Sequence, residues 1–422
     1  MRFSVVNLGC KVNAYETEGV ARQLEQKGYE RVPFSEGAEI TVIFTCAVTN
    51  TAAAKSRRMI HRARRKHPDG IVAVAGCYAQ IDADALLEAD ILIGTREKNK
   101  LADYIEAFTS DHQRIRAVKE LEGAVFEPLP VDRFEGKTRA FLKIQDGCNQ
   151  FCAYCVIPYA RGRERSMEPD AVIAEAKRIS ANHKEIVLAG IHTGRYGREY
   201  GVTLADLLER LLAEVPELSR IRISSIEVTE LDDHFLNLLY EEPRIARHLH
   251  IPVQSGSDGV LRRMGRPYTK AEFLSKINEI RSKLPDISIS TDLMVGFPGE
   301  TEAEFEETLA FMKECRFSFL HVFPYSVRSG TKAAVMHDQI DAETKKKRAR
   351  ICIDLSERLY DAYKDSMIGK PVDVLCESNG TGHTSEYLEV ELEEPCEAGE
   401  LVPAVISRRE GNKLFGKKER QV

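Results

Sequence analysis

Short apolar runs alternate with longer amphipathic stretches over the first hundred residues. The stretches between the runs have the composition of helices, and this alternation is typical of the β/α units that build a parallel sheet. The predicted strands have the sequences "FSVVNLGC", "ITVIFTC", "GIVAVAGC" and "ADILIGT". We therefore expect an N-terminal parallel α/β sheet domain over residues 1–112.

The alternation stops and then restarts. Residues 113–133 contain Pro128 and Pro130 and are expected to form a linker. Beyond them, strands are predicted at "RAFLKIQ", "KEIVLAG", "RIRISSIE", "HLHIPVQ", "ISISTDLMVG" and "FSFLHVFPYS". These repeated units predict a partial (β/α)6 barrel over residues 134–364, with its functional groups at the C-terminal ends of the strands. Within it, "GFPGET" predicts a helix start with Thr301 as cap and Glu304 completing a capping box.

A long charged helix from about Asp341 to Ser366 leads into the last part of the chain. Short β-like runs separated by Gly and Pro follow, which predicts a small β-barrel over residues 365–422, of the size of OB-like modules. The predicted fold class is therefore α/β, in three parts.

Composition is that of an ordinary globular chain, with 43% hydrophobic and 30% charged residues. No apolar run is long enough to span a bilayer, and the N-terminus has the pattern of a strand rather than of a signal peptide, so we expect a cytoplasmic protein without a membrane partner. Ten cysteines are too few for a disulfide framework in a chain of this length. The net charge of -6 disfavours general nucleic-acid affinity but leaves room for a local basic patch.

Three cysteines are clustered in "DGCNQFCAYC", where Cys148, Cys152 and Cys155 form a C-x3-C-x2-C run. A structural zinc site needs a fourth ligand, and the next histidine, His183, lies beyond a predicted helix. Three thiolates on a 4Fe-4S cluster instead leave one iron open, which can bind the amine and carboxylate of a small molecule. The run therefore favours an iron–sulfur site over zinc.

Cys10, Cys46 and Cys77 have no local spacing motif, but each ends a predicted strand. Neighbouring parallel strands end on the same edge of a sheet, where doubly wound folds build their sites. Any one of these cysteines alone would be interpreted as a small buried hydrophobic residue. The three equivalent positions together favour a second three-ligand cluster.

The C-x3-C-x2-C run, with Tyr154 before its last cysteine, resembles the signature of radical S-adenosylmethionine enzymes. Together with "GCKVN", "TCAVTN", "AGCYAQ" and "LHIPVQSGSD", it makes essentially the whole chain resemble the methylthiotransferases. The resemblance implies an auxiliary 4Fe-4S cluster on Cys10, Cys46 and Cys77, and a catalytic 4Fe-4S cluster that binds S-adenosylmethionine on Cys148, Cys152 and Cys155. It also implies a C-terminal RNA-binding TRAM domain and two S-adenosylmethionine per turnover, one as methyl donor and one as radical source.

Within that family, "GCKVN", "TCAVTNTAAAKSRR", "GIHTG" and "HVFPYS" resemble the branch that acts on N6-threonylcarbamoyladenosine at position 37 of tRNA. Lys11 and Val12 stand where other branches usually have Gln-Met or Pro-Lys. The alternatives are the branches for isopentenylated adenosine-37 and for ribosomal protein S12. The resemblance implies three partners: a tRNA anticodon loop, a small reducing electron-donor protein and a sulfur donor.

Two further groups of residues are predicted to bind ligands. By the same resemblance, strand ends that face S-adenosylmethionine carry Gly190, Ser225, Glu227, Gln254 and Ser255. An acid-free helix after the Cys46 strand has the clustered positive charge expected of phosphate contacts, from Lys55, Arg57, Arg58, Arg62, Arg64, Arg65 and Lys66.

Two rival interpretations come from other classes of protein. A non-catalytic, metal-dependent RNA-binding protein would hold zinc, but the fourth ligands are missing. An electron carrier with two clusters would leave the barrel and the basic helix without a purpose. A methylthiotransferase accounts for all of these features.

Overall fold

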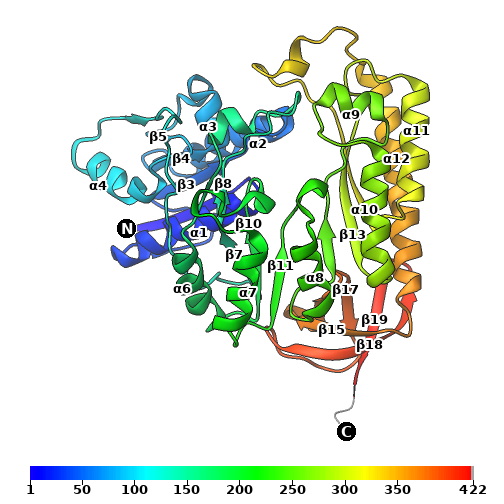
Figure 1. Cartoon of the computed structure of the whole chain (residues 1–422). Coiled ribbons are helices and arrows are strands. Elements are labelled where there is room, and N and C mark those ends of the chain that lie inside the picture. Colours follow the sequence, from blue (N-terminus) through cyan, green and yellow to red (C-terminus); the bar gives the residue numbers. More distant parts are fainter. Residues whose placement is uncertain (420–422) are drawn as a thin grey trace.

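The computed structural model describes residues 1–419 and has three packed parts (Figure 1). The N-terminal part is a six-stranded parallel sheet in the order β2-β1-β3-β4-β5-β6. Its strands are β1 (Arg2–Asn7), β2 (Glu30–Arg31), β3 (Ile40–Thr45), β4 (Ile71–Gly76), β5 (Ile91–Ile93) and β6 (Ile115–Ala117). Its helices are α1 (Lys11–Gln26), α2 (Asn50–Lys66), α3 (Cys77–Ile81) and α4 (Leu101–Asp111). Strands β3 and β4 are buried throughout, because α1 and α4 pack on one face and α2 and α3 on the other.

Strand β6 lies within residues 113–133, the segment expected to be a linker. It pairs in parallel with β5, with Ile91 opposite Ile115, so the N-terminal sheet continues past residue 112. Only three residues long and exposed at Arg116, this strand has too short a pattern to be recognised from the sequence.

The central part is an open barrel of six parallel strands. Its two sheets, β7-β10-β11 and β12-β13-β14, are joined by a parallel bridge between Ile221 and Ile245. The strands are β7 (Arg139–Lys143), β10 (Glu185–Ala189), β11 (Arg220–Ile223), β12 (His248–His250), β13 (Ser288–Val295) and β14 (Phe319–Pro324). A separate two-stranded antiparallel sheet is formed by β8 (Gln145–Asp146) and β9 (Arg165–Ser166). The helices are α5 (Ile157–Arg161), α6 (Pro169–Ser180), α7 (Leu204–Glu214), α8 (Asp233–Glu241), α9 (Asp258–Met264), α10 (Lys270–Lys283), α11 (Glu302–Glu314) and α12 (Ala342–Ser366). As predicted, Thr301 caps α11 and Glu304 completes a capping box.

The C-terminal part is a closed five-stranded β-barrel that lies below the central strands in Figure 1. Its strands are β15 (Pro371–Cys376), β16 (Thr381–Thr384), β17 (Glu389–Leu392), β18 (Leu401–Glu410) and β19 (Lys413–Lys418). It docks on the N-terminal ends of the central strands, where Arg220 donates to the carbonyl of Asp373 (2.6 Å) and Arg222 to that of Thr384 (3.1 Å). Residues 420–422 of the expected C-terminal domain lie outside the described residues.

One hydrophobic core runs without interruption from the N-terminal sheet into the central barrel, and the C-terminal barrel has its own. The predicted α/β fold class and its three-part architecture are confirmed. Within residues 1–419, no helix combines the length and apolarity that a bilayer crossing requires.

Candidate active site

The cysteines of the central run form what we call the central trio: Cys148, Cys152 and Cys155. They lie on the loop that follows β8, at the carboxyl end of the central strand β7. Gly147 opens this loop with φ +73°, and a Cβ atom there would collide with the carbonyl oxygen of Arg163, so only glycine fits. Further along, the backbone N–H of Ala153 donates to the carbonyl of Met264 (2.8 Å) and ties the loop to α9.

The thiols of the central trio influence one another electrostatically. Burial raises the pKa of Cys155 to about 12, and the charges of Cys152 and Cys148 act in the same direction. His192 Nδ1 lies 3.5 Å from the Cys148 sulfur, and Arg266 donates to the Cys152 sulfur at 3.6 Å. Cationic neighbours of this kind stabilise the thiolate form that binds metal.

His192 is held as a cation by the groups around it. Burial opposes its charge, but hydrogen bonds with Cys148, Glu164 and Glu230 raise its pKa to about 11. Its Nε2 atom lies 2.7 Å from a Glu230 oxygen and its Nδ1 atom 3.4 Å from Glu164. The imidazole therefore links one cysteine of the central trio to two carboxylates.

The other three candidates form what we call the N-terminal trio: Cys10, Cys46 and Cys77. They follow β1, β3 and β4, which are neighbours in the sheet, and so converge on one edge although they are 36 and 31 residues apart. Burial raises the pKa of Cys77 to about 11, Arg161 lowers it, and the charges of Cys10 and Cys46 raise it. The adjacency of β1, β3 and β4 therefore places the three cysteines at neighbouring strand ends.

A buried ionic network lies behind Cys77 and joins the N-terminal and central parts. The guanidinium of Arg161 is fully buried and donates to the Cys77 sulfur (3.2 Å), to Glu16 (2.9 Å) and to Asp146 (3.1 Å). Lys143 contacts the same two carboxylates at 2.7 Å each. The remaining cations are Lys98 on Glu16 and Arg165 on Asp146. Four cations thus surround two carboxylates, and one of the cations, Arg161, contacts Cys77, where a thiolate or an anionic cluster would balance part of the excess positive charge.

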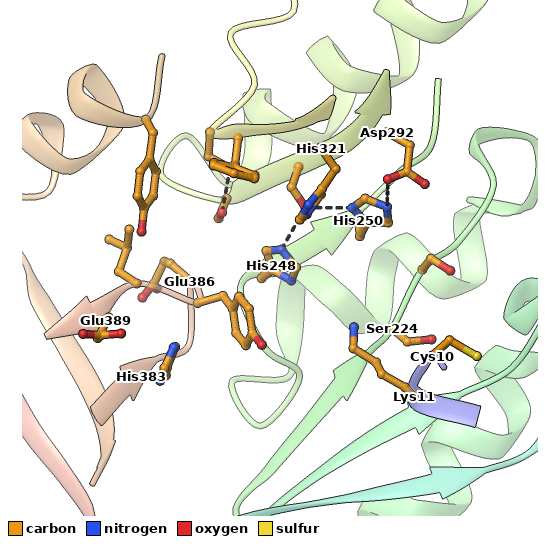
Figure 2. Close-up of a pocket in the computed structure, with 18 of the residues that line it drawn as sticks. Cys10, Lys11, Ser224, His248, His250, Asp292, His321, His383, Glu386 and Glu389 are labelled. Atoms are coloured by element: carbon orange, nitrogen blue, oxygen red, sulfur yellow. Dashed lines mark hydrogen bonds and ion pairs between the residues drawn. The ribbon is translucent and has the colours of Figure 1, made fainter. Parts of the chain in front are cut away.

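A cavity of about 840 Å³ is enclosed by the start of α1, the interior of the central barrel and the C-terminal barrel (Figure 2). Cys10 and Lys11 form one side of it. The opposite wall carries His248, His250 and His321 from β12 and β14, with His250 paired to Asp292 (3.4 Å). These walls supply hydroxyl, imidazole and charged groups, while Phe319, Phe323, Tyr360 and Tyr387 line other parts of the cavity, so it suits a ligand with both polar and apolar faces.

The residues predicted to contact S-adenosylmethionine do not all reach this cavity. Gly190 and Ser225 line it. Gln254 has φ +71° and a buried side-chain oxygen that has no hydrogen-bond partner among residues 1–419, so this amide is available to a ligand. Glu227 is paired with the arginine that contacts Cys152. Ser255 is fully buried and hydrogen-bonded inside the protein, away from the cavity.

Helix α2 divides the predicted RNA-binding residues into two groups. Five are exposed, and their spacing places the first four on one helix face: Lys55, Arg58, Arg62, Arg65 and Lys66. Arg57 and Arg64 are half-buried, with Arg57 donating to the Tyr78 hydroxyl and Arg64 pairing with Asp90 at 2.6 Å. Only the exposed face is free to meet phosphates.

Sequence reasoning missed the polar side chains that touch the cysteines. Arg161 and Arg266 lie in the segments "VIPYARG" and "LRRMGRPYT", but an arginine beside a turn is usually solvated. His192 lies in "GIHTG", of which only Gly190 is among the predicted ligand contacts. A cation six residues after the last cysteine of the C-x3-C-x2-C run is the signal that could have identified Arg161.

Two protein families match the chain. Residues 142–312 match the Radical SAM superfamily, and residues 2–94 match the Uncharacterized protein family UPF0004. Among solved structures, the cobalamin- and 4Fe-4S-bound radical S-adenosylmethionine methyltransferase TsrM from Kitasatospora setae is similar in fold, with a TM-score of 0.58 at 14% identity over 79% of this chain and 74% of that chain.

Curated relatives extend the similarity over nearly the whole chain. The threonylcarbamoyladenosine tRNA methylthiotransferase MtaB of Bacillus subtilis is 44% identical over 91% of this chain and 88% of its own length. The protein of the same name from Aquifex aeolicus is 36% identical, over 96% of this chain and 100% of its own. A tRNA-2-methylthio-N(6)-dimethylallyladenosine synthase from Clostridium botulinum is 34% identical over 91% and 87%. The chain therefore belongs to the radical S-adenosylmethionine tRNA methylthiotransferase family.

Proposed function

We propose that this enzyme methylthiolates C2 of N6-threonylcarbamoyladenosine at position 37 of tRNA in the cytoplasm, and consumes two S-adenosylmethionine per turnover. The names of the relatives at 44% and 36% identity support this substrate. The observation that carries the proposal is the pairing of two three-thiol groups in one chain, each at the carboxyl ends of parallel strands. A single radical-generating site would need only one of them.

Both trios fit a 4Fe-4S cluster with one iron left open. Each supplies three sulfur ligands, and each has a buried guanidinium that donates to a ligand sulfur, Arg161 to Cys77 and Arg266 to Cys152. The excess of cations behind Cys77 suits an anionic group. Once bound, the cluster of the central trio would supply the electron that cleaves S-adenosylmethionine, and that of the N-terminal trio a place to carry the sulfur.

The chain's own groups would orient the reactants. Gly190, Ser225, Glu227 and the unpartnered amide of Gln254 would hold S-adenosylmethionine beside the central trio. The exposed face of α2 and the C-terminal barrel would bind the phosphates of the anticodon arm, because clustered cations provide the salt-dependent part of RNA affinity. RNA readers take unstacked loop bases into pockets, so the loop adenosine would enter the cavity. A small reducing protein and a sulfur donor complete the reaction.

Mass spectrometry of tRNA nucleosides tests the substrate. Cells that lack the protein should lose 2-methylthio-N6-threonylcarbamoyladenosine and accumulate the unthiolated nucleoside. Loss of the isopentenyl counterpart instead, or modification of ribosomal protein S12, would assign the enzyme to another branch.

Anaerobic reconstitution tests the assignment of the two trios. We expect about eight iron atoms per chain, from two clusters of four, and about half of that in either triple Cys→Ala variant. The central-trio variant should lose cleavage of S-adenosylmethionine altogether, whereas the N-terminal-trio variant should keep cleavage and lose thiolation. Bound zinc, or no cleavage by the reduced wild-type enzyme, would contradict the proposal.

A further inference from the structure

Lys11 stands out among the residues of the cavity because its charge is not matched. It is the first residue of α1, directly after Cys10, and Figure 2 shows its ammonium end pointing into the cavity. Within residues 1–419, no carboxylate lies close enough to form an ion pair with it, and no hydrogen bond joins it to another group. Asp292, the acidic residue of the barrel wall, is engaged by His250 at 3.4 Å. Lys11 is exposed towards the open cavity, so its ammonium is free to meet an anion that enters there.

The groups around Lys11 suit a carboxylate. Ser224 lies beside it, directly after β11, and the imidazoles of His250 and His321 line the wall opposite. Hydroxyl and imidazole N–H groups can donate to the second oxygen of a carboxylate whose first oxygen meets the ammonium. The acidic residues of the C-terminal barrel, Glu386 and Glu389, lie on the far side of the cavity.

We propose that Lys11 determines substrate specificity by binding the free carboxylate of the threonylcarbamoyl group. This inference rests on the proposed function and deepens it. In the adenine ring only N1 separates C2, where sulfur is added, from the carbon that bears the N6 substituent. A base presented with C2 towards Cys10 therefore carries its N6 substituent close to the neighbouring residue, Lys11. An isopentenyl group has no charge and would leave the ammonium unpaired.

The decisive experiment changes both partners of the proposed contact, the Lys11 side chain and the threonine carboxylate of the RNA. Anticodon stem–loop RNA carrying N6-threonylcarbamoyladenosine is compared with the same RNA in which the threonine carboxylate is a primary amide. The dissociation constants are measured for reconstituted wild-type, K11M, K11Q and K11R enzymes, with iron content recorded for each. K27M is the matched control, because Lys27 ends the same helix and pairs with Asp103 and Glu106 outside the cavity.

Wild type, K11R and K27M should bind the acid RNA about tenfold to a hundredfold more tightly than the amide RNA, which is the range for a charged hydrogen bond. K11M and K11Q should bind the two RNAs equally, with the loss confined to the acid RNA. Equal binding of the two RNAs by wild type, or a preference for the acid that survives in K11M and K11Q, overturns the inference. The amide comparison in wild type needs no variant, so it stands even if a substitution lowers the iron content.

Failure of the proposed function gives a different result. Wild-type enzyme would then methylthiolate neither stem–loop, while acting on one that carries isopentenyladenosine. Efficient methylthiolation of the acid and amide RNAs with the same KM would support the proposed function. It would contradict the proposed role of Lys11 in binding the carboxylate.

Discussion

The two cysteine trios offer the same three sulfur donors but are assembled in different ways. The central trio lies within residues 148–155, on a single loop. The N-terminal trio is spread over residues 10–77 and exists only because β1, β3 and β4 lie side by side. The comparison teaches that a set of metal ligands can be defined by a short sequence motif or by the order of strands in a sheet. A ligand set defined by strand order depends on the folding of the whole domain.

The two trios nevertheless share two supports. A glycine with positive φ directly precedes a cysteine in each, Gly147 before Cys148 and Gly76 before Cys77. A buried arginine also donates to one sulfur in each, although Arg161 belongs to a network of six charged groups and Arg266 pairs with one carboxylate. These parallels allow the trios to be tested with matched substitutions.

The largest expected effect is a loss of unfolding free energy on replacing Arg161, which should exceed the loss on replacing Arg266. Arg161→Met leaves Glu16 and Asp146 buried with fewer partners, and breaking such a network costs about 3–5 kcal/mol of unfolding free energy. Arg266→Met should cost less, because the Glu227 it leaves is 14% exposed. Urea unfolding and the iron content per chain are measured for both variants. Arg161→Met should lose iron from the N-terminal trio first. Equal losses in the two variants would mean that the network gives the N-terminal trio no special support.

A pH-dependent effect tests how the N-terminal part is held against the central barrel. Glu175 of α6 accepts a hydrogen bond from Tyr15 of α1 (2.8 Å), and burial raises its pKa to about 7. The folded state therefore binds more protons than the unfolded state between pH 4.5 and 7, so the unfolding free energy falls as pH rises through this range and is level above it. Glu175→Gln should thus gain up to about 3 kcal/mol over wild type at pH 8 and nothing at pH 4.

Denaturation of both proteins across this pH range measures the Glu175→Gln effect. The glutamine amide keeps an oxygen that can accept the hydrogen bond from Tyr15. The variant should therefore differ from wild type only in how its unfolding free energy changes with pH. A slope unchanged by the substitution would show that Glu175 does not titrate as described.

The glycines should produce an intermediate effect. Gly76→Ala and Gly147→Ala each force alanine into a positive φ, which costs about 1–3 kcal/mol, and each brings a Cβ against backbone. We expect each variant to lose iron from its own trio and to keep the other. Gly136→Ala is the control, since Gly136 also has positive φ but nothing within 4 Å of its Cβ position. Loss of all iron in either cysteine-loop variant would show that the two sites depend on each other.

The smallest effect concerns the basic helix that follows Cys46. Arg58→Ala and Arg62→Ala should each weaken tRNA binding about threefold and lower its salt dependence by about one unit, as expected for a single phosphate contact. Arg64→Ala removes the same charge from the same helix, but this side chain is already paired with Asp90. It should therefore lower stability and leave the salt dependence unchanged. A salt dependence reduced equally in all three variants would contradict the division of the helix into two faces.

Much of the molecule was predictable because its signals are local. The alternation of strands and helices gave the three-part α/β architecture, and the capping box at Thr301 was confirmed in detail. Short or irregular features were not predictable: β6 is too brief to show a period, and Ser255, which follows the end of β12 by five residues, is buried in the interior. A pattern of residue types says which side of a strand is buried, and does not say which cavity a strand end faces.

By itself, the sequence determined the fold class, the spacing of the central trio and the family resemblance, because each depends on neighbouring residues or on repeated patterns. Only the tertiary structure decided that Arg161 is buried against Cys77 and that Lys11 faces a cavity lined by histidines from strands far along the chain. The physical reason is that the effect of a charge depends on its burial and its partners, and both are set by segments distant in sequence.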